Sequence, residues 1–343
     1  MTSRATIGEC AINAVPVATN QGFKNFVPFQ TTDGEFLYYL LQTKKQDFIS
    51  LCGGSTFLEI GKTQLADFKI ALPKEKIEQT AIATILSDAD ALIESLSQLI
   101  AKKRQIKQGA MQELLTGKRR LPGFQVKPGY KQTEVGVIPE NWEVKRLGEV
   151  ADVIDPHPSH RAPNEVANGV SFVGIGDLDE KGNIIGKNVR LVSPEVLKEH
   201  ALRYNLKDEL IGLGRVASIG KVVSLKIFSE AYAISPTLGV IRGCEVKRCY
   251  LLYALKSKFV MDQFTKIMSG STRSSVGMEV LRELQIDLPS SEQEQTAIAT
   301  VLSDMDGEIA ALEARRDKAR LLKQGMMQEL LTGRIRLLQR DSA

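Results

Sequence analysis

Residues 78–117 read EQTAIATILSDADALIESLSQLIAKKRQIKQGAMQELLTG, and residues 294–333 read EQTAIATVLSDMDGEIAALEARRDKARLLKQGMMQELLTG. The two stretches align at an offset of 216 residues without a gap, and 25 of the 40 positions are identical. Internal repeats are sought first, because they decide the architecture of a chain. The chain is therefore a tandem duplication, and its function is to be sought in what the two copies hold.

Each copy predicts an unusually long helix. We expect the first helix over 74–117 and the second over 290–333, with Gly117 ending the first. Apolar residues recur at alternating spacings of three and four, which is the heptad pattern of a coiled coil. The predicted coiled-coil seam consists of Ile82, Ile85, Leu92, Leu96, Leu99, Ile298, Val301, Met305, Leu312 and Leu322.

A long amphipathic helix has to cover its apolar seam. Because the two helices match in length and register, we expect them to pair within the chain as an antiparallel coiled coil. Helices of about 43 residues, at 1.5 Å per residue, would then hold two globular domains about 60 Å apart. The alternatives are that each helix covers its seam on a separate partner, or that two chains dimerise.

The rest of the sequence is mixed in character, and the predicted fold class is α+β, with two mixed α/β domains of which the first is partial. Short apolar runs between Gly, Pro and Asn predict strands and turns, and residues 36–49 predict one buried helix. The predicted divisions are a partial domain over 1–73, a helix over 74–117, a linker over 118–133, a domain over 134–289, a helix over 290–333 and a tail over 334–343.

The repeat continues beyond the helices. Leu72-Pro73 matches Leu288-Pro289 at the same offset, and after small gaps Ile7-Gly8 matches Ile219-Gly220. In this alignment the first copy lacks roughly 80 residues, those that correspond to 133–213. We therefore expect Met1 to fall inside a domain, whose uncovered apolar surface makes residues 1–73 the least stable folded part.

Composition narrows the class of protein. The net charge of +4 is mild and permits a polyanionic partner. No apolar run reaches the roughly 18 residues of a membrane span, and no signal peptide opens the chain, so a cytoplasmic protein without a membrane partner is expected. Cys244 and Cys249 could form half a metal site, but buried reduced thiols are the default for scattered cysteines.

No catalytic motif stands out in the sequence. His157 and His160 lie in DPHPSH, where the prolines favour an irregular loop with solvated histidines over a metal site. The glycine pairs at 174–176 and 212–214 stand outside any nucleotide-binding motif. We expect no catalytic residue and no metal site in this chain.

Basic residues in turn-rich segments are the candidates for contact with DNA, because Lys and Arg neutralise phosphates. Small neighbours in GLGRVASIGK and SGSTRSS would allow close backbone approach. The predicted DNA-binding residues are Arg215, Lys221, Arg273, Arg161 and Lys24. The alternative for each of them is ordinary surface charge.

The repeated element resembles the specificity subunit of type I restriction–modification enzymes. The residues that carry the resemblance are IALPKEKIEQTAIATILSDAD and KQGAMQELLTG with their second copies, the LPGF linker at 121–124, and TEVGVIPENWEVKRLGEVAD at 133–152. The resemblance covers nearly the whole chain. It implies two target-recognition domains that each read one half of a bipartite DNA sequence, separated by the two helices.

The same resemblance implies the partners. The coiled coil would dock modification subunits, and restriction subunits would join the complex. This chain would hold no cofactor, since S-adenosylmethionine, ATP and Mg belong to those partner subunits. The short first domain departs from the family pattern, so either the gene was truncated or rearranged, and only one half-site is read, or a second chain completes the domain. A coiled-coil scaffold without a DNA role and an enzyme with unrecognised motifs are the competing interpretations.

Overall fold

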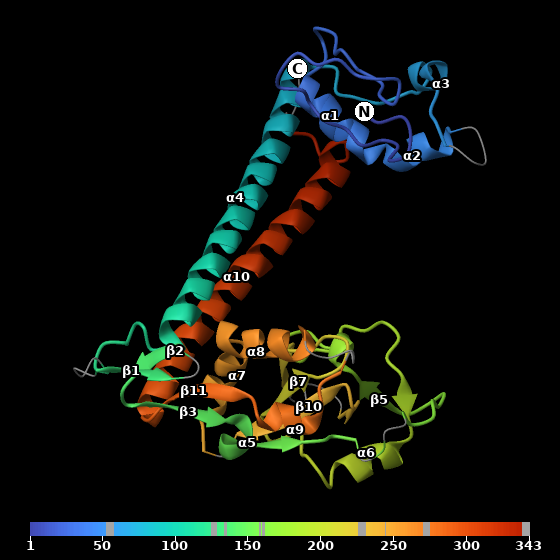
Figure 1. Ribbon diagram of the computed structural model, residues 1–343. Coiled ribbons are helices and arrows are strands. Elements are labelled where there is room, and N and C mark those ends of the chain that lie inside the picture. Colours follow the sequence, from blue (N-terminus) through green and yellow to red (C-terminus); the bar gives the residue numbers. More distant parts are fainter. Residues whose placement is uncertain are drawn as a thin grey trace. The chain divides into compact units, whose positions relative to one another are not determined.

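The computed structural model of the chain (Figure 1) describes residues 1–52, 58–124, 129–133, 136–157, 159, 162–225, 231–243, 245–269 and 275–337. Its internal contacts divide the chain into unit 1, Met1–Lys102 with Ile309–Ala343, and unit 2, Lys103–Glu308. Both divisions cut a long helix, so each unit contains one piece of α4 (Lys76–Leu114) and one piece of α10 (Glu292–Leu330). The domain boundaries predicted from the sequence remain predictions.

Unit 1 is built from helices around its pieces of α4 and α10. The Oδ1 atom of Asp33 accepts a hydrogen bond from the Phe36 N–H at 2.9 Å, which caps the first helix. The short helices are α1 (Gly34–Thr43), α2 (Lys45–Ser50) and α3 (Lys62–Ala66). The single helix predicted over 36–49 is thus divided at Lys44, whose backbone (φ −96°, ψ 7°) leaves the helical conformation.

Two apolar clusters hold unit 1 together. Phe36, Tyr39 and Leu40 of α1 pack against Ile82 and Leu86 of α4 in the first cluster. The second cluster consists of Ile7, Leu41, Phe48 and Ile60. Among its described residues, the first 73 positions contain no extended strand, only isolated bridges such as Thr2–Phe23. The short strands predicted for this segment are therefore not formed there.

Unit 2 mixes strands with helices. Its strands are β1 (Tyr130–Thr133), β2 (Gly136–Pro139), β3 (Trp142–Arg146), β4 (Ala151–Ile154), β5 (Val170–Val173), β6 (Leu191–Val192), β7 (Leu210–Gly214), β8 (Val222–Leu225), β9 (Ala233–Ile234), β10 (Leu238–Gly243) and β11 (Gln285–Pro289). Its helices are α5 (Leu147–Val150), α6 (Pro194–His200), α7 (Arg248–Leu255), α8 (Lys258–Ser269) and α9 (Met278–Arg282), with a 3₁₀ turn, η1 (Ile175–Asp177).

The strands of unit 2 form small sheets. The largest has the order β4-β10-β7-β8, and all its neighbours are antiparallel. β5 lies between β6 and β9, while β11 pairs with β3 and β1 with β2. One face of the large sheet packs with α7, α8 and the long helices around Trp142, Tyr250 and Leu302. The other side encloses a second cluster around Leu178, Tyr204 and Tyr232.

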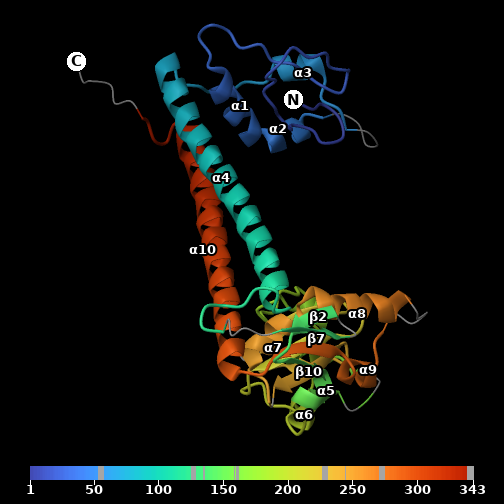
Figure 2. The ribbon, with the colours of Figure 1, turned by 60° about the vertical axis from the view of Figure 1, so that its left-hand side comes forward.

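The pieces of α4 and α10 run antiparallel and side by side within each unit (Figures 1 and 2). In unit 1, Asp90 of α4 pairs with Lys323 of α10. In unit 2, Lys107 of α4 pairs with Asp306 of α10. Early positions of one helix thus meet late positions of the other, and the antiparallel coiled coil expected from the sequence is confirmed.

The interior positions of the helices differ in part from the predicted seam. Three predicted residues are buried, namely Ile82, Leu96 and Ile298. Four more are partly buried, namely Ile85, Val301, Met305 and Leu312. Three are exposed, so their assignment to the seam was wrong: Leu92, Leu99 and Leu322. The buried residues that replace them include Leu86, Ile100, Leu302 and Ile309.

The difference between the predicted and the observed seam has a simple physical cause. The observed seam advances by four and then three residues from Ile82, whereas the predicted seam advanced by three and then four. Both choices keep the heptad spacing, and the sequence offers apolar residues for both, as at Leu99 and Ile100. Ile85 and its counterpart Val301 are partly buried against the apolar clusters of their units, which combine residues of both long helices with residues of the globular parts.

A glycine lies three residues after the last residue of each long helix. Gly117 and Gly333 have φ angles of +67° and +73°, in the left-handed region that favours glycine, so Gly117 ends α4 as predicted. Among the described residues, no helix combines the length and the apolarity that would let it cross a membrane.

Candidate nucleic-acid interface

The turn between β7 and β8 brings together separate parts of unit 2. Arg215 lies at its start, and its Nε donates a hydrogen bond to the Val276 carbonyl at 3.0 Å. The same guanidinium lies 3.6 Å from the Asp155 carboxylate, and the next residue, Val216, forms a bridge with Ser275. Arg215 therefore joins the turn to the segment after β4 and to the segment before α9.

Lys221 closes the other end of this turn. Its Nζ donates hydrogen bonds to the carbonyls of Ile175, at 3.1 Å, and Leu178, at 2.6 Å. These acceptors belong to η1 and the residue that follows it. The ammonium group thus fixes the turn against the end of β5, where Gly174 N–H in turn donates to the Asp177 carboxylate.

The segment after β4 is held by further arginines. Arg203 donates to the Asp155 carbonyl at 3.3 Å, and Arg190 donates to the Pro163 carbonyl at 3.2 Å. Two of the predicted DNA-binding residues, Arg161 and Arg273, lie outside the described residues, as do His160 and Cys244.

Lys24 is the predicted DNA-binding residue of unit 1. Its Nζ donates to Ser3 Oγ at 3.2 Å and lies 3.8 Å from the Glu59 carboxylate. All three described candidates, Lys24, Arg215 and Lys221, therefore contact acceptors of their own chain. A guanidinium has five N–H donors and a lysine has three, so these contacts leave capacity for phosphate. Contact with DNA remains a prediction for all five residues.

Two histidines of unit 2 form a buried chain of hydrogen bonds. His157 Nδ1 lies 2.9 Å from His200 Nε2, and His200 Nδ1 lies 3.0 Å from the Tyr204 hydroxyl. The Tyr204 oxygen also accepts a hydrogen bond from the Ile234 N–H at 2.9 Å, which extends the chain to β9. Burial lowers the pKa of His200 to about 4, with the nearby His157 as a second cause, so it is neutral. Among the described residues, no cluster of His, Cys, Asp and Glu could hold a metal.

The long helices carry the same polar cluster twice. In unit 1, Lys323 Nζ lies 2.6 Å from Asp90 Oδ1, and the Tyr39 hydroxyl donates to Asp90 Oδ2 at 2.8 Å. The ammonium also lies 5.1 Å from the centre of the Tyr39 ring. Burial and the neighbouring Asp90 raise the pKa of Tyr39, which keeps its hydroxyl a donor.

Unit 2 repeats this arrangement. Lys107 Nζ lies 2.5 Å from Asp306 Oδ1 and 5.5 Å from the centre of the Tyr253 ring, while the Tyr253 hydroxyl donates to Asp306 Oδ2 at 2.8 Å. Asp306 and Lys323 stand 216 positions after Asp90 and Lys107. Each helix thus contributes the acid in one unit and the base in the other, and a tyrosine from the globular part joins each pair.

A second ion pair also occurs at equivalent positions in both units. Arg120 pairs with Glu294 in unit 2 through two short hydrogen bonds, and Arg336 pairs with Glu78 in unit 1. The hydrogen bonds from Arg336 lower the pKa of Glu78 and outweigh the effect of burial. These residues escaped the sequence analysis, although the repeat contained the signal, since Glu78 and Glu294 are aligned in it.

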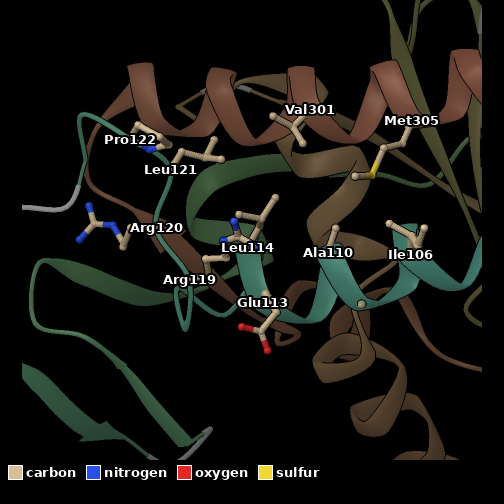
Figure 3. A pocket seen from close by; sticks show the side chains of 11 residues that line it. Ile106, Ala110, Glu113, Leu114, Arg119, Arg120, Leu121, Pro122, Val301 and Met305 are labelled. Atoms are coloured by element: carbon tan, nitrogen blue, oxygen red, sulfur yellow. The ribbon is translucent and has the colours of Figure 1, made fainter. Parts of the chain in front are cut away.

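A pocket of about 420 Å³ opens in unit 2 at the end of α4 (Figure 3). Val301 and Met305 project from α10 toward Ala110 and Leu114 of α4, and Leu121 of the following linker lies on the same side. Glu113, Arg119 and Arg120 add charged groups to the lining. In the other repeat, Ala110 is replaced by Met326, which packs against the apolar cluster of unit 1.

Comparisons with known proteins agree on one family. The family model described as type I restriction modification DNA specificity domain matches residues 1–105 and 139–321. The MjaIX specificity subunit of a type I restriction enzyme from Methanocaldococcus jannaschii is 38% identical over 301 residues, which are 84% of this chain and 66% of that protein. The MjaVIII specificity subunit of the same organism is 29% identical over 89% of this chain and 71% of its own length.

A solved structure shares the fold. The crystal structure of the S subunit of a type I restriction–modification system from M. genitalium superposes with a TM-score of 0.57 at 16% sequence identity. The match covers 88% of this chain and 73% of that chain. The mixed helix and strand content and the long helices of this chain are those of such subunits.

Proposed function

Because the chain belongs to the family of type I restriction–modification DNA specificity proteins, we propose that it selects the DNA sequence on which a modification and restriction complex acts. The observation that carries this proposal is the family match across both copies of the repeat, joined to a helix pair whose polar contacts recur in each unit. DNA recognition is the part of the function that belongs to the family as a whole. The reading of one DNA half-site, the docking of partner subunits and the absence of catalysis by this chain are more specific parts of the proposal.

We place the reading of one half-site in unit 2. Its candidate surface is the turn 215–221 together with the segments that Arg215 and Lys221 hold, because basic groups there stand beside small residues that permit close approach. Phosphate contacts would supply affinity, and side chains entering a groove would supply the sequence preference. Arg161, Arg273 and Lys24 complete the proposed set of DNA contacts.

The long helices are the proposed dock for the modification subunits. The apolar pocket at the end of α4 offers such a partner a place for a side chain, beside exposed charged groups. In this proposal the chain itself is not catalytic, the partner subunits carry S-adenosylmethionine, ATP and Mg, and the complex works in the cytoplasm. The length of the two helices would set the unread spacer of a bipartite target.

The proposal is tested by producing this chain together with the modification subunit that is encoded next to it. We expect the two proteins to copurify and to methylate adenines in one defined motif, mapped by sequencing the modified DNA. We also expect DNA binding to weaken steeply with salt, because phosphate contacts release counterions. A complex that forms but methylates no defined motif, and binds DNA without salt dependence, would indicate a scaffold instead. Methylation by the purified chain alone would indicate an enzyme.

A further inference from the structure

We infer that Leu202 of unit 2 is an apolar wedge that enters the DNA between adjacent bases and so takes part in sequence recognition. The inference rests on the proposed function, because it needs a protein that contacts DNA through this unit. It adds a contact with bases, made from a turn to which none of the predicted DNA-binding residues belongs.

Leu202 is the most exposed large apolar side chain among the described residues, with 88% of its surface accessible. It lies in the turn 201–203, directly after α6 (Figure 1). Its two neighbours, Ala201 and Arg203, are exposed as well. The tip of this turn therefore presents one large apolar group to whatever approaches it.

The turn is held on both sides by buried residues. His200 precedes it and Tyr204 follows it, and the His200 Nδ1 lies 3.0 Å from the Tyr204 hydroxyl. The Leu202 N–H donates to the Glu199 carbonyl at 3.3 Å, and the Arg203 N–H donates to the His200 carbonyl at 2.9 Å. Leu202 thus stands on a fixed backbone, so its insertion would require little ordering of the protein.

The same turn is joined to the proposed DNA-contact surface through Asp155. Arg203 donates to the Asp155 carbonyl at 3.3 Å, while the Arg215 guanidinium lies 3.6 Å from the Asp155 carboxylate. Because both guanidinium groups contact one residue, Arg203 and Arg215 lie close together. Leu202, next to Arg203 in the chain, therefore adjoins the surface that Arg215 occupies.

The buried histidine pair provides a second link between the same two segments. His157 stands two residues after Asp155, and its backbone N–H donates to the Asp155 carboxylate at 3.2 Å. Its ring nitrogen lies 2.9 Å from that of His200, the last residue of α6. The pair thereby fixes the turn of Leu202 against the segment that also holds Arg215.

A single apolar side chain among charged groups suits DNA better than a protein surface. Within residues 190–209, Leu202 is the one large apolar residue that is exposed. The charged groups within one helical turn of it are Lys198, Glu199 and Arg203. Protein partners are recognised by apolar side chains gathered in patches, whereas DNA-binding proteins insert single Leu, Ile, Phe or Met side chains between base steps.

The wedge would act on recognition through the shape of the DNA. Insertion of Leu202 would unstack one base step and bend the duplex, while the cations beside it lie against phosphates. The cost of unstacking depends on the sequence, since pyrimidine–purine steps open more readily than others. Leu202 would therefore favour such a step in the half-site that unit 2 reads, without forming a hydrogen bond to a base.

The wedge is tested with the complex of the full chain and the modification subunit, on the DNA motif that methylation mapping defines. The first probe is 2-aminopurine, which replaces each adenine of the motif in turn, apart from the methylated one, and fluoresces more strongly when unstacked. The second is energy transfer between dyes at the two duplex ends, which reports bending. We expect the wild-type complex to unstack one step and to bring the ends closer together.

Four proteins are compared in this test. Leu202→Ala should lose most of both signals and weaken binding about tenfold, because it removes the apolar surface that insertion buries. The salt dependence of its binding should stay unchanged, since no phosphate contact is removed. Leu202→Met keeps a long apolar side chain and should retain both signals. Val137→Ala, at another exposed apolar residue of unit 2, is the matched control and should behave as the wild type.

Two results would overturn the wedge and leave the proposed function standing. One is equal unstacking and bending by the wild type and Leu202→Ala. The other is a Leu202→Ala variant that bends DNA normally but no longer copurifies with the modification subunit, because Leu202 would then contact a protein. A wild-type complex that methylates no defined motif would contradict the proposed function and the wedge together, so the two failures are distinct.

Discussion

Asp287 is a carboxylate on the buried part of β11. Its Oδ1 accepts no hydrogen bond from the described residues, and burial raises the pKa of Asp287 from 3.8 to about 6. The aligned residue in the other repeat is Ala71. The folded state therefore binds the proton of Asp287 more tightly than the unfolded state does, and the charged form weakens unit 2.

We predict that Asp287→Asn stabilises unit 2 by about 1–3 kcal/mol at pH 7, because a raised pKa in the folded state costs stability as pH rises through it. The difference should vanish near pH 4, where Asp287 is protonated in the fold. Trp142, the single tryptophan, is buried in β3 beside β11, so its fluorescence during urea unfolding reports this unit. Asp208→Asn at an exposed site is the control. Equal gains at pH 4 and pH 7 would contradict the assignment.

Some residues of the candidate site could be predicted from the sequence, but their contacts could not. Arg215 and Lys221 stand out because they lie in a turn with small neighbours, but their acceptors lie 61, 46 and 43 positions away. No local pattern encodes such distances. Asp287 could have been found, since the repeat aligns it with Ala71 and its neighbours Ile286 and Leu288 are apolar.

At the scale of elements, the two long helices were the most predictable part of the fold. Their extent follows from the repeat and the heptad pattern, and their antiparallel pairing from equal length and register. The seam was predicted less well, because adjacent apolar residues such as Leu99 and Ile100 satisfy two heptad frames. The choice between the frames appears only in tertiary packing, where Ile100 is buried and Leu99 is exposed.

The adjacent pair gives a direct test of the seam. We predict that Ile100→Ala destabilises unit 1 by about 2–4 kcal/mol, because it removes buried apolar contacts and leaves a cavity. Leu99→Ala, one position away and exposed, should cost less than about 1 kcal/mol. Hydrogen exchange along α4 measures both. A larger effect from Leu99→Ala would support the frame predicted from the sequence.

The ion pairs of the helices give a second test at this scale. A double-mutant cycle of Asp90→Ala and Lys323→Ala should show a coupling of about 1–2 kcal/mol, since the ammonium is largely buried and a tyrosine hydroxyl shares the carboxylate. The cycle of Asp306→Ala and Lys107→Ala is the matched control and should give a similar value. Hydrogen exchange of the two helices is the measurement, and additive effects in both cycles would show that the pairs do not interact.

At the scale of the whole molecule, the two units differ in how completely they cover their apolar residues. The sequence predicted this difference, because residues 133–213 have no aligned counterpart in the first repeat as given. It did not predict that the remaining segment would form bridges in place of strands, because a strand needs a partner and periodicity describes only one chain segment at a time.

We therefore predict that limited proteolysis cuts within residues 11–29 before it cuts unit 2. This segment exposes Val15, Val27 and Phe29 and forms no helix or extended strand. Sites are identified by mass spectrometry of the early fragments, with residues 231–243 as the comparison. First cleavage in β10, with 11–29 intact, would show that unit 1 is the more stable part.

The reciprocal ion pairs have a consequence for assembly. Since α4 carries both Asp90 and Lys107, it contains both members of the contact that it makes with α10. A second copy of α4, run in the opposite direction, would satisfy the same contacts through a true two-fold axis. The contact surface of the helix is thus self-complementary. One repeat alone carries both residues of the ion pair that a symmetric homodimer would need. The duplicated chain corresponds to such a dimer with its two copies joined covalently. Its globular parts differ in sequence, whereas both helices keep the residues that pair them.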